Sequence, residues 1–219
     1  AASDVYKRQG TIREILHRGI HISFVVGLVF IFYSWKKIDH SKKNFNTPFI
    51  DIILSILVVI SALYLPLLPP EVLAPRVGNP ENIDIIMGSF LIVLTLEAAR
   101  RSIGFTLPLI CVLFILFAIF GPYFPGALKH GGTSWIGFVN HIYITNQGIY
   151  GIAVGVMAQY VFLFILFGVL ATRIGLGQLF IDLAMVIAGK YSGGPAKVAI
   201  FSSAFLGTIS GSSIANTVT

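Results

Sequence analysis

The chain contains an uncharged run that determines its fold class: Ile149-Tyr-Gly-Ile-Ala-Val-Gly-Val-Met-Ala-Gln-Tyr-Val-Phe-Leu-Phe-Ile-Leu-Phe-Gly-Val-Leu-Ala-Thr172. About 20 apolar residues in a helix cross the hydrocarbon core of a bilayer, which is roughly 30 Å thick. This run exceeds that length. Gly151 and Gly155 near its start have the spacing that lets helices pack closely. The run therefore predicts a transmembrane helix.

Four further apolar segments precede this one and predict membrane spans: Ile15–Trp35, Phe49–Leu68, Ile83–Ala99 and Phe105–Phe120. Hydrophobic residues make up 56% of the chain and charged residues only 11%, whereas a soluble domain averages about 25% charged residues. We therefore expect an all-α integral membrane protein with about five transmembrane helices. The net charge of +6 does not indicate a nucleic-acid partner, because the cations gather at the ends of the spans.

The loop charges predict an orientation. Lysines at 36, 37, 42 and 43 follow the first span, Arg100 and Arg101 follow the third, and Arg173 follows the fifth. Arg100 and Arg101 are explained as cytoplasmic anchors, and Glu97 can pair with Arg101, four residues further along the same helix face. The intervening loops carry fewer cations, so the positive-inside rule places them outside and the first group in the cytoplasm. The N-terminus would then lie outside, and we expect one further helix upstream. Residues 1–9 resemble a translated linker and are excluded from the fold as a non-native leader.

The external connection between Gly121 and Gly148 contains an aromatic amphipathic stretch, Ser134–Ile144. Such a stretch is typical of a helix that lies in the membrane interface. The alternative is a docking surface for an extracytoplasmic partner. After the fifth span, Gly175-Leu-Gly177 breaks the helix. An amphipathic segment then follows over Gln178–Lys190, with one apolar face formed by Leu179, Phe180, Leu183, Ala184 and Ile187.

The end of the chain is unusually polar for its setting. An apolar helix over Ala196–Leu206 leads into Gly207-Thr-Ile-Ser-Gly-Ser-Ser-Ile-Ala-Asn-Thr-Val-Thr219. Small residues in this pattern can simply allow helices to pack. Three serine hydroxyls around Gly211 and the amide of Asn216 exceed what packing needs, because such groups are costly in hydrocarbon without partners.

A helix broken at Gly211 offers free carbonyl and hydroxyl oxygens to Na⁺, and the N–H groups of the following half-helix favour a carboxylate. The candidate sodium and substrate residues are Ser210, Gly211, Ser212, Ser213 and Asn216. No other metal and no cofactor is expected, and Na⁺ serves as a coupling ion. The chain has no phosphate-binding loop and no nucleophile elbow, so we do not expect an enzyme.

Several segments together resemble the large membrane subunit of tripartite ATP-independent periplasmic (TRAP) transporters. They are Tyr160–Gly168, Gly175–Asp182, Ser192–Val198 and Gly207–Asn216, with Leu96–Gly104 and Phe120–Gly126 upstream. The pattern is similar to the fused, TAXI-type permeases, in which a small subunit precedes the large one. The chain is then expected to be an N-terminal fragment of such a permease.

The resemblance implies a sodium-driven secondary transporter of the bacterial or archaeal inner membrane, which moves its solute by an elevator motion. Its partners would be a periplasmic solute-binding protein, a small organic anion (a carboxylate or amino acid) and the lipid bilayer. Residues 10–147 would form a small-subunit-like scaffold, and residues 148–219 the start of the transport region, truncated in its first re-entrant hairpin. Gly207–Asn216 would be the tip of that hairpin. The alternatives are another sodium-coupled carrier of similar hairpin architecture and a non-transporting membrane scaffold.

Overall fold

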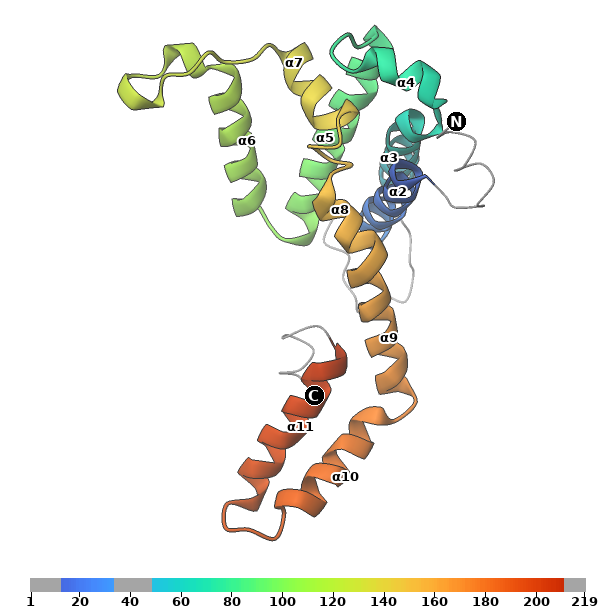
Figure 1. The fold of residues 1–219 in the computed structure, drawn as a ribbon, viewed down its shortest axis with the longest axis vertical. Coiled ribbons are helices and arrows are strands. Elements are labelled where there is room, and N and C mark those ends of the chain that lie inside the picture. Colours follow the sequence, from blue (N-terminus) through green and yellow to red (C-terminus); the bar gives the residue numbers. More distant parts are fainter. Residues whose placement is uncertain (1–12, 34–48, 211–219) are drawn as a thin grey trace. The chain divides into compact units, whose positions relative to one another are not determined.

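The computed structural model describes residues 13–33 and 49–210, and every regular element among them is helical (Figure 1). The α-helices are α2 (Glu14–Phe32), α3 (Phe49–Leu67), α4 (Pro70–Arg76), α5 (Asn82–Ser102), α6 (Thr106–Ile119), α7 (Trp135–Val139), α8 (Ile152–Val156), α9 (Phe162–Arg173), α10 (Leu176–Ala188) and α11 (Gly194–Ser210). Two short 3-10 turns, η1 (Gly121–Tyr123) and η2 (Gly126–Leu128), follow α6, and two π-helical turns, η3 (Asn140–Ile144) and η4 (Met157–Val161), follow α7 and α8. The chain divides into two compact units between Gly155 and Val156.

Four helices in the described ranges are long and apolar enough to cross a membrane: α2, α3, α5 and the continuous stretch Ile152–Ala171. These agree with four of the predicted spans and confirm the all-α membrane class. The remaining predicted span, Phe105–Phe120, contains only the 14 residues of α6. Its helix is about 21 Å long, because Gly121 and Pro122 end it in a 3-10 turn.

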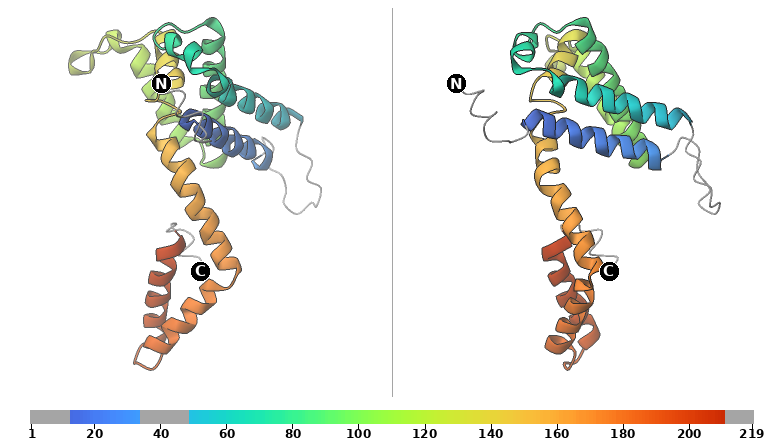
Figure 2. Two further views of the ribbon diagram at one scale, coloured as in Figure 1. Left: turned by 45° about the vertical axis from the view of Figure 1, so that its right-hand side comes forward. Right: turned by 90° about the vertical axis from the view of Figure 1, so that its right-hand side faces the viewer.

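In the first unit, α2 and α3 lie side by side and α5 packs against both (Figure 2). Glycine residues allow these helices to approach one another closely. A Cβ atom at Gly19 of α2 would lie 2.7 Å from the Pro66 ring of α3, and one at Gly88 of α5 would lie 2.6 Å from Val139 of α7. The core that these contacts enclose includes Leu65, Leu91 and Tyr143.

Pro66 lies inside α3 and interrupts its hydrogen bonding. Proline has no N–H, so the carbonyl of Ala62, four residues earlier, loses its helical partner. The hydroxyl of Tyr150 donates to this carbonyl at 2.8 Å, and the hydroxyl of Tyr143 donates to the neighbouring Ser61 carbonyl at 2.7 Å. Burial raises the pKa of Tyr143, which keeps its hydroxyl a neutral donor. The segment after α7 is thereby attached to the break in α3.

The hydrogen bond from Tyr150 to the Ala62 carbonyl predicts an energetic coupling between Tyr150 and Pro66. Tyr150→Phe leaves the buried Ala62 carbonyl without a donor and should lower the free energy of unfolding by about 1–3 kcal/mol. In a Pro66→Ala background the helical N–H is restored, so the same change should cost less. A double-mutant cycle of unfolding free energies in detergent micelles measures the difference. Equal costs in the two backgrounds would contradict the role given to Tyr150.

The predicted interfacial stretch, Ser134–Ile144, forms α7 and η3, with Ser134 as the N-cap of α7. Val139 and Tyr143 are fully buried in the core, whereas Trp135 and Ile136 are 39% and 51% exposed. The Trp135 indole N–H donates to the Ser89 hydroxyl of α5 at 2.9 Å. One face of the stretch therefore packs on the bundle, and its first turn presents apolar side chains outward.

The second unit is built on the α10–α11 pair. Of the residues on the predicted apolar face of α10, Ala184 is buried and Phe180 is half-buried, whereas Leu179, Leu183 and Ile187 are exposed within this unit. The buried residues of α10 are Gly177, Ala184 and Ala188, so small side chains make the close contacts. The ring of Phe180 lies 5.6 Å from that of Phe205 in α11.

Candidate solute site and buried charges

The candidate solute site begins at the C-terminal end of α11. The first four residues of the polar run, Gly207 to Ser210, continue this helix. The predicted site residues Gly211, Ser212, Ser213 and Asn216 lie outside the described residues, and only the backbone of Ser210 is described. The assignment of these five residues to sodium or substrate stays a prediction.

The start of α11 has residues typical of a membrane–water interface. Lys197 is exposed, and its ammonium group lies 5.6 Å from the centre of the Tyr191 ring. Lysine and tyrosine favour the interface. The helix rises by about 20 Å between Lys197 and Ser210, which is about two-thirds of a hydrocarbon core of about 30 Å.

The polar side chains of the fifth span lie in the π-helical turn η4. Gln159 is half-buried within its unit, and Tyr160 is 59% exposed. Gly155, in the first unit, has the packing role that its spacing predicts. A Cβ atom there would lie 2.9 Å from the Arg18 guanidinium of α2, and that guanidinium donates to the Tyr150 carbonyl at 2.8 Å.

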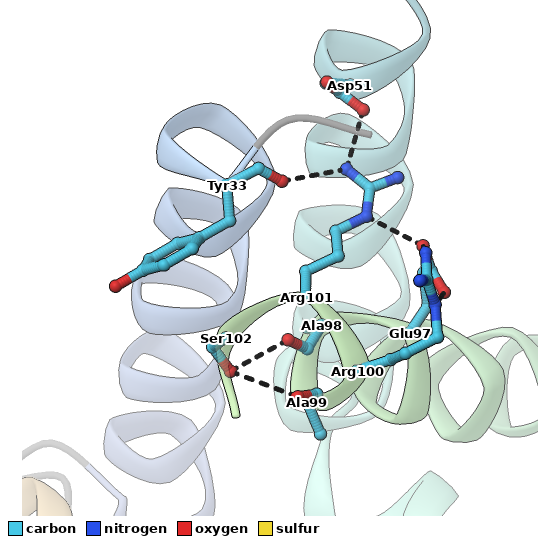
Figure 3. A network of polar contacts seen from close by, with 8 residues as sticks. All are labelled: Tyr33, Asp51, Glu97, Ala98, Ala99, Arg100, Arg101 and Ser102. Atoms are coloured by element: carbon cyan, nitrogen blue, oxygen red, sulfur yellow. Dashed lines mark hydrogen bonds and ion pairs between the residues drawn. The ribbon is translucent and has the colours of Figure 1, made fainter. Parts of the chain in front are cut away.

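The first unit contains a buried ion-pair network where α2, α3 and α5 meet (Figure 3). The guanidinium of Arg101 donates to Asp51 at 2.7 Å, to Glu97 at 2.8 Å and to the Tyr33 carbonyl at 3.2 Å. Its side chain is 3% exposed and that of Asp51 is 0% exposed. Arg101 also lies 4.8 Å from the centre of the Phe30 ring. One guanidinium therefore joins three helices.

Sequence reasoning predicted part of this network. The pairing of Glu97 with Arg101, four residues apart on α5, is confirmed. Arg100, predicted as a membrane anchor, is 40% exposed and pairs with Glu97. Arg101 was predicted to have the same role, but it is buried in the bundle. Asp51 was missed, although a carboxylate at the start of an apolar helix signals a buried partner.

A second buried carboxylate, Asp84, lies where α3, α4 and α5 meet. It accepts hydrogen bonds from the Arg76 guanidinium at 2.8 Å, the Tyr64 hydroxyl at 3.0 Å and the Glu81 backbone N–H at 2.9 Å. Its side chain is 0% exposed. Glu81 completes a capping box at the start of α5 and pairs with Arg76 at 2.9 Å.

The buried charges of these two networks neutralise one another, because each buried carboxylate pairs with a guanidinium. In the described part of the chain, no group of three histidine, cysteine, aspartate or glutamate side chains could hold a metal ion. The hydroxyl-rich run after α11 is the segment whose composition suits ion and solute binding.

Comparison with known proteins identifies the family. The family model described as "Tripartite ATP-independent periplasmic transporter, DctM component" matches residues 90–219. No curated protein and no solved structure matches the chain. The matched range begins within α5, upstream of the boundary predicted at residues 147 and 148, and the assignment of the two predicted domains stays a prediction. The match includes every segment from Leu96 onward that carried the resemblance. It extends over more than half of the chain, which therefore belongs to the DctM-component family of TRAP transporters, a family of multi-pass membrane transport proteins.

Proposed function

We propose that this chain is part of the permease of a sodium-coupled secondary transporter of the inner membrane, which imports an organic anion delivered by a periplasmic binding protein. Membership in a tripartite periplasmic transporter family supports the transport role and the need for partner subunits. The substrate class and the coupling ion are proposed from the residues after α11.

The run that continues α11 is the observation that carries this proposal. Na⁺ is a hard cation that prefers oxygen ligands, and the serines at 210, 212 and 213 and the amide of Asn216 supply such oxygens. A helix that breaks at Gly211 frees carbonyl oxygens as well, whereas the N-terminus of the next half-helix attracts a carboxylate. A sodium ion and an organic anion could then bind at one hairpin tip.

The rival proposal is a scaffold in which the run serves only packing. The α10–α11 pair shows how this unit packs, since the buried small residues of α10 are Gly177, Ala184 and Ala188. None of them carries a hydroxyl. Close packing here is achieved with glycine and alanine, so the serines and asparagine of the run need another explanation. Ligand binding provides one.

Ser210→Ala and Asn216→Ala test the proposal in the complete transporter with its binding protein. Each change removes an oxygen ligand and should raise the sodium concentration for half-maximal uptake by about tenfold, which corresponds to about 1.4 kcal/mol. Uptake into proteoliposomes at varied sodium concentrations is the measurement. Ser202→Ala is the matched control, because Ser202 lies in the body of α11 and donates to its own helix at Ala199.

The control should leave the sodium dependence unchanged. Unchanged sodium dependence in both site variants, with normal amounts of protein in the membrane, would overturn the site assignment. Sodium-independent uptake by the unaltered transporter would overturn the proposed coupling.

A further inference from the structure

The region around α6 has a hydrophobic run that is longer than its helix. Residues 103–128 contain no aspartate, glutamate, lysine or arginine, yet α6 covers only 14 of them. At about 1.5 Å per residue α6 is about 21 Å long, which leaves about 9 Å of a 30 Å hydrocarbon core uncrossed. Some other structure must occupy that remaining thickness.

Helix α6 itself has the surface of a lipid-facing helix. Its residues are apolar around the whole circumference, and Pro108 is its only buried residue among those described. Leu113 and Phe114 are 56% and 68% exposed. A helix with apolar residues on all faces belongs in a protein core or in a membrane, and α6 contacts the rest of its unit mainly through α5.

The segment after α6, residues 120–133, is called here the α6 tip. Irregular backbone is excluded from lipid because its unpaired N–H and C=O groups are costly there. The α6 tip pairs part of the backbone groups at this helix end. The carbonyls of Leu116, Phe117 and Ala118 accept hydrogen bonds from the Phe120 N–H at 2.8 Å, the His130 ring at 3.0 Å and the Thr133 N–H at 3.0 Å.

His130 holds this arrangement together. Its Nδ1 accepts the Gly132 N–H at 3.1 Å, so the ring proton is assigned to Nε2, which donates to the Phe117 carbonyl. The imidazole lies 4.6 Å from the Phe117 ring, and Phe124 lies 5.0 Å from the same ring. Gly121 lies directly under the imidazole, where a Cβ atom would overlap it. Within the tip, the N–H groups of Tyr123, Phe124, Lys129 and His130 are also paired with backbone carbonyls.

The outward-facing side chains of the tip are apolar or aromatic. Phe120, Tyr123 and Leu128 are 49%, 84% and 59% exposed. The next residue, Lys129, is exposed and ends the uncharged run. This order, apolar residues followed by a long cationic side chain, matches the passage from hydrocarbon to headgroups.

We propose that the α6 tip is inserted into the bilayer and completes the crossing that α6 begins, with lipid as its partner. The predicted orientation makes this the outer leaflet. The proposal adds a lipid-contacting surface to the chain and does not depend on sodium coupling or on the solute site.

Site-directed spin labelling tests the proposal in the complete transporter, reconstituted into phosphatidylcholine–phosphatidylglycerol nanodiscs. In a Cys111→Ser background, single cysteines replace Tyr123 or Leu128. Leu113→Cys on α6 is the lipid reference, and Asn79→Cys in the exposed loop after α4 is the aqueous reference. Labels at 123 and 128 should be accessible to oxygen and protected from a water-soluble nickel complex, as at 113. Accessibility to nickel like that at 79 would overturn the proposal, and so would protection from both reagents, which would mean that protein covers the tip.

A matched pair of glycine variants tests the role of the contact between His130 and the end of α6. Gly121→Ala must displace the His130 ring, whereas a Cβ atom at Gly131 meets nothing within 4 Å. With the label at residue 128, Gly121→Ala should shift the accessibility toward the aqueous reference, and Gly131→Ala should not. His130→Ala should act like Gly121→Ala, with the exposed His141→Ala as its control. The proposal is contradicted if neither Gly121→Ala nor His130→Ala shifts the accessibility of the label at residue 128.

Discussion

Asp51→Asn is expected to destabilise the first unit by about 3–5 kcal/mol, because it removes the charge that balances the buried Arg101 guanidinium. Both side chains are almost completely buried, and their charged atoms lie 2.7 Å apart. Arg101 would keep Glu97, but Glu97 already pairs with Arg100 through two hydrogen bonds. Among the described residues, Glu97 would then be the carboxylate that serves both guanidinium groups. Unfolding free energies of the purified protein in detergent micelles measure the effect.

Two further variants separate loss of the pair from loss of a charge. Arg100→Gln also removes a charge from this network, but the Arg100 side chain is 40% exposed, and exposed pairs contribute about 0–1 kcal/mol. Its effect should be correspondingly small. The double variant Asp51→Leu with Arg101→Met should be less destabilised than either single variant, since no buried charge is left without a partner. Equal destabilisation by Asp51→Asn and Arg100→Gln would show that the buried pair has no special importance.

The fold class could be predicted from the sequence because membrane helices depend on local hydropathy and length. Four spans have this property in the described structure. The expected span at Phe105–Phe120 shows the limit of the same reasoning. Hydropathy continues past Ile119, but the backbone leaves the helix at Gly121-Pro122. A hydropathy pattern does not distinguish a helix from a compact apolar turn, and a Gly-Pro pair favours the turn.

The buried charges could be predicted only where both partners lie on one helix. Glu97 and Arg101 are one turn apart, so spacing alone indicated their contact. Asp51 is 50 residues from Arg101 in the chain, and their contact requires α3 to approach α5. That approach depends on side-chain packing, which one sequence does not reveal. For the candidate site, the composition of Ser210–Asn216 indicated a chemistry, and of these residues only the backbone of Ser210, at the end of α11, is described.

The carboxylate of Asp84 supports a second prediction of similar size, at the opposite end of α5. Asp84→Asn should destabilise the first unit by about 3–5 kcal/mol, because the Arg76 guanidinium, whose side chain is 13% exposed, loses its buried partner. The Glu81 N–H and Tyr64 hydroxyl would also lose a charged acceptor, and hydrogen bonds to charged groups are the stronger ones. Unfolding free energies in detergent micelles again provide the measurement.

The effect should appear first in the connection between α4 and α5, since Arg76 holds that connection to the helix ends. The Arg76 carbonyl accepts a hydrogen bond from the Asn140 amide at 3.4 Å, and the Gly78 N–H donates to the same amide's oxygen at 3.4 Å. Hydrogen exchange of residues 76–81 should therefore accelerate in Asp84→Asn more than exchange in the middle of α5. Glu81→Gln is the control, because its side chain is 59% exposed and its pair with Arg76 is open to solvent. If hydrogen exchange accelerated equally in both variants, surface charge rather than the buried carboxylate would stabilise this loop. Acceleration in Asp84→Asn alone would assign the order of this loop to the buried carboxylate, and α7 with η3 would then depend on the same contact through Asn140.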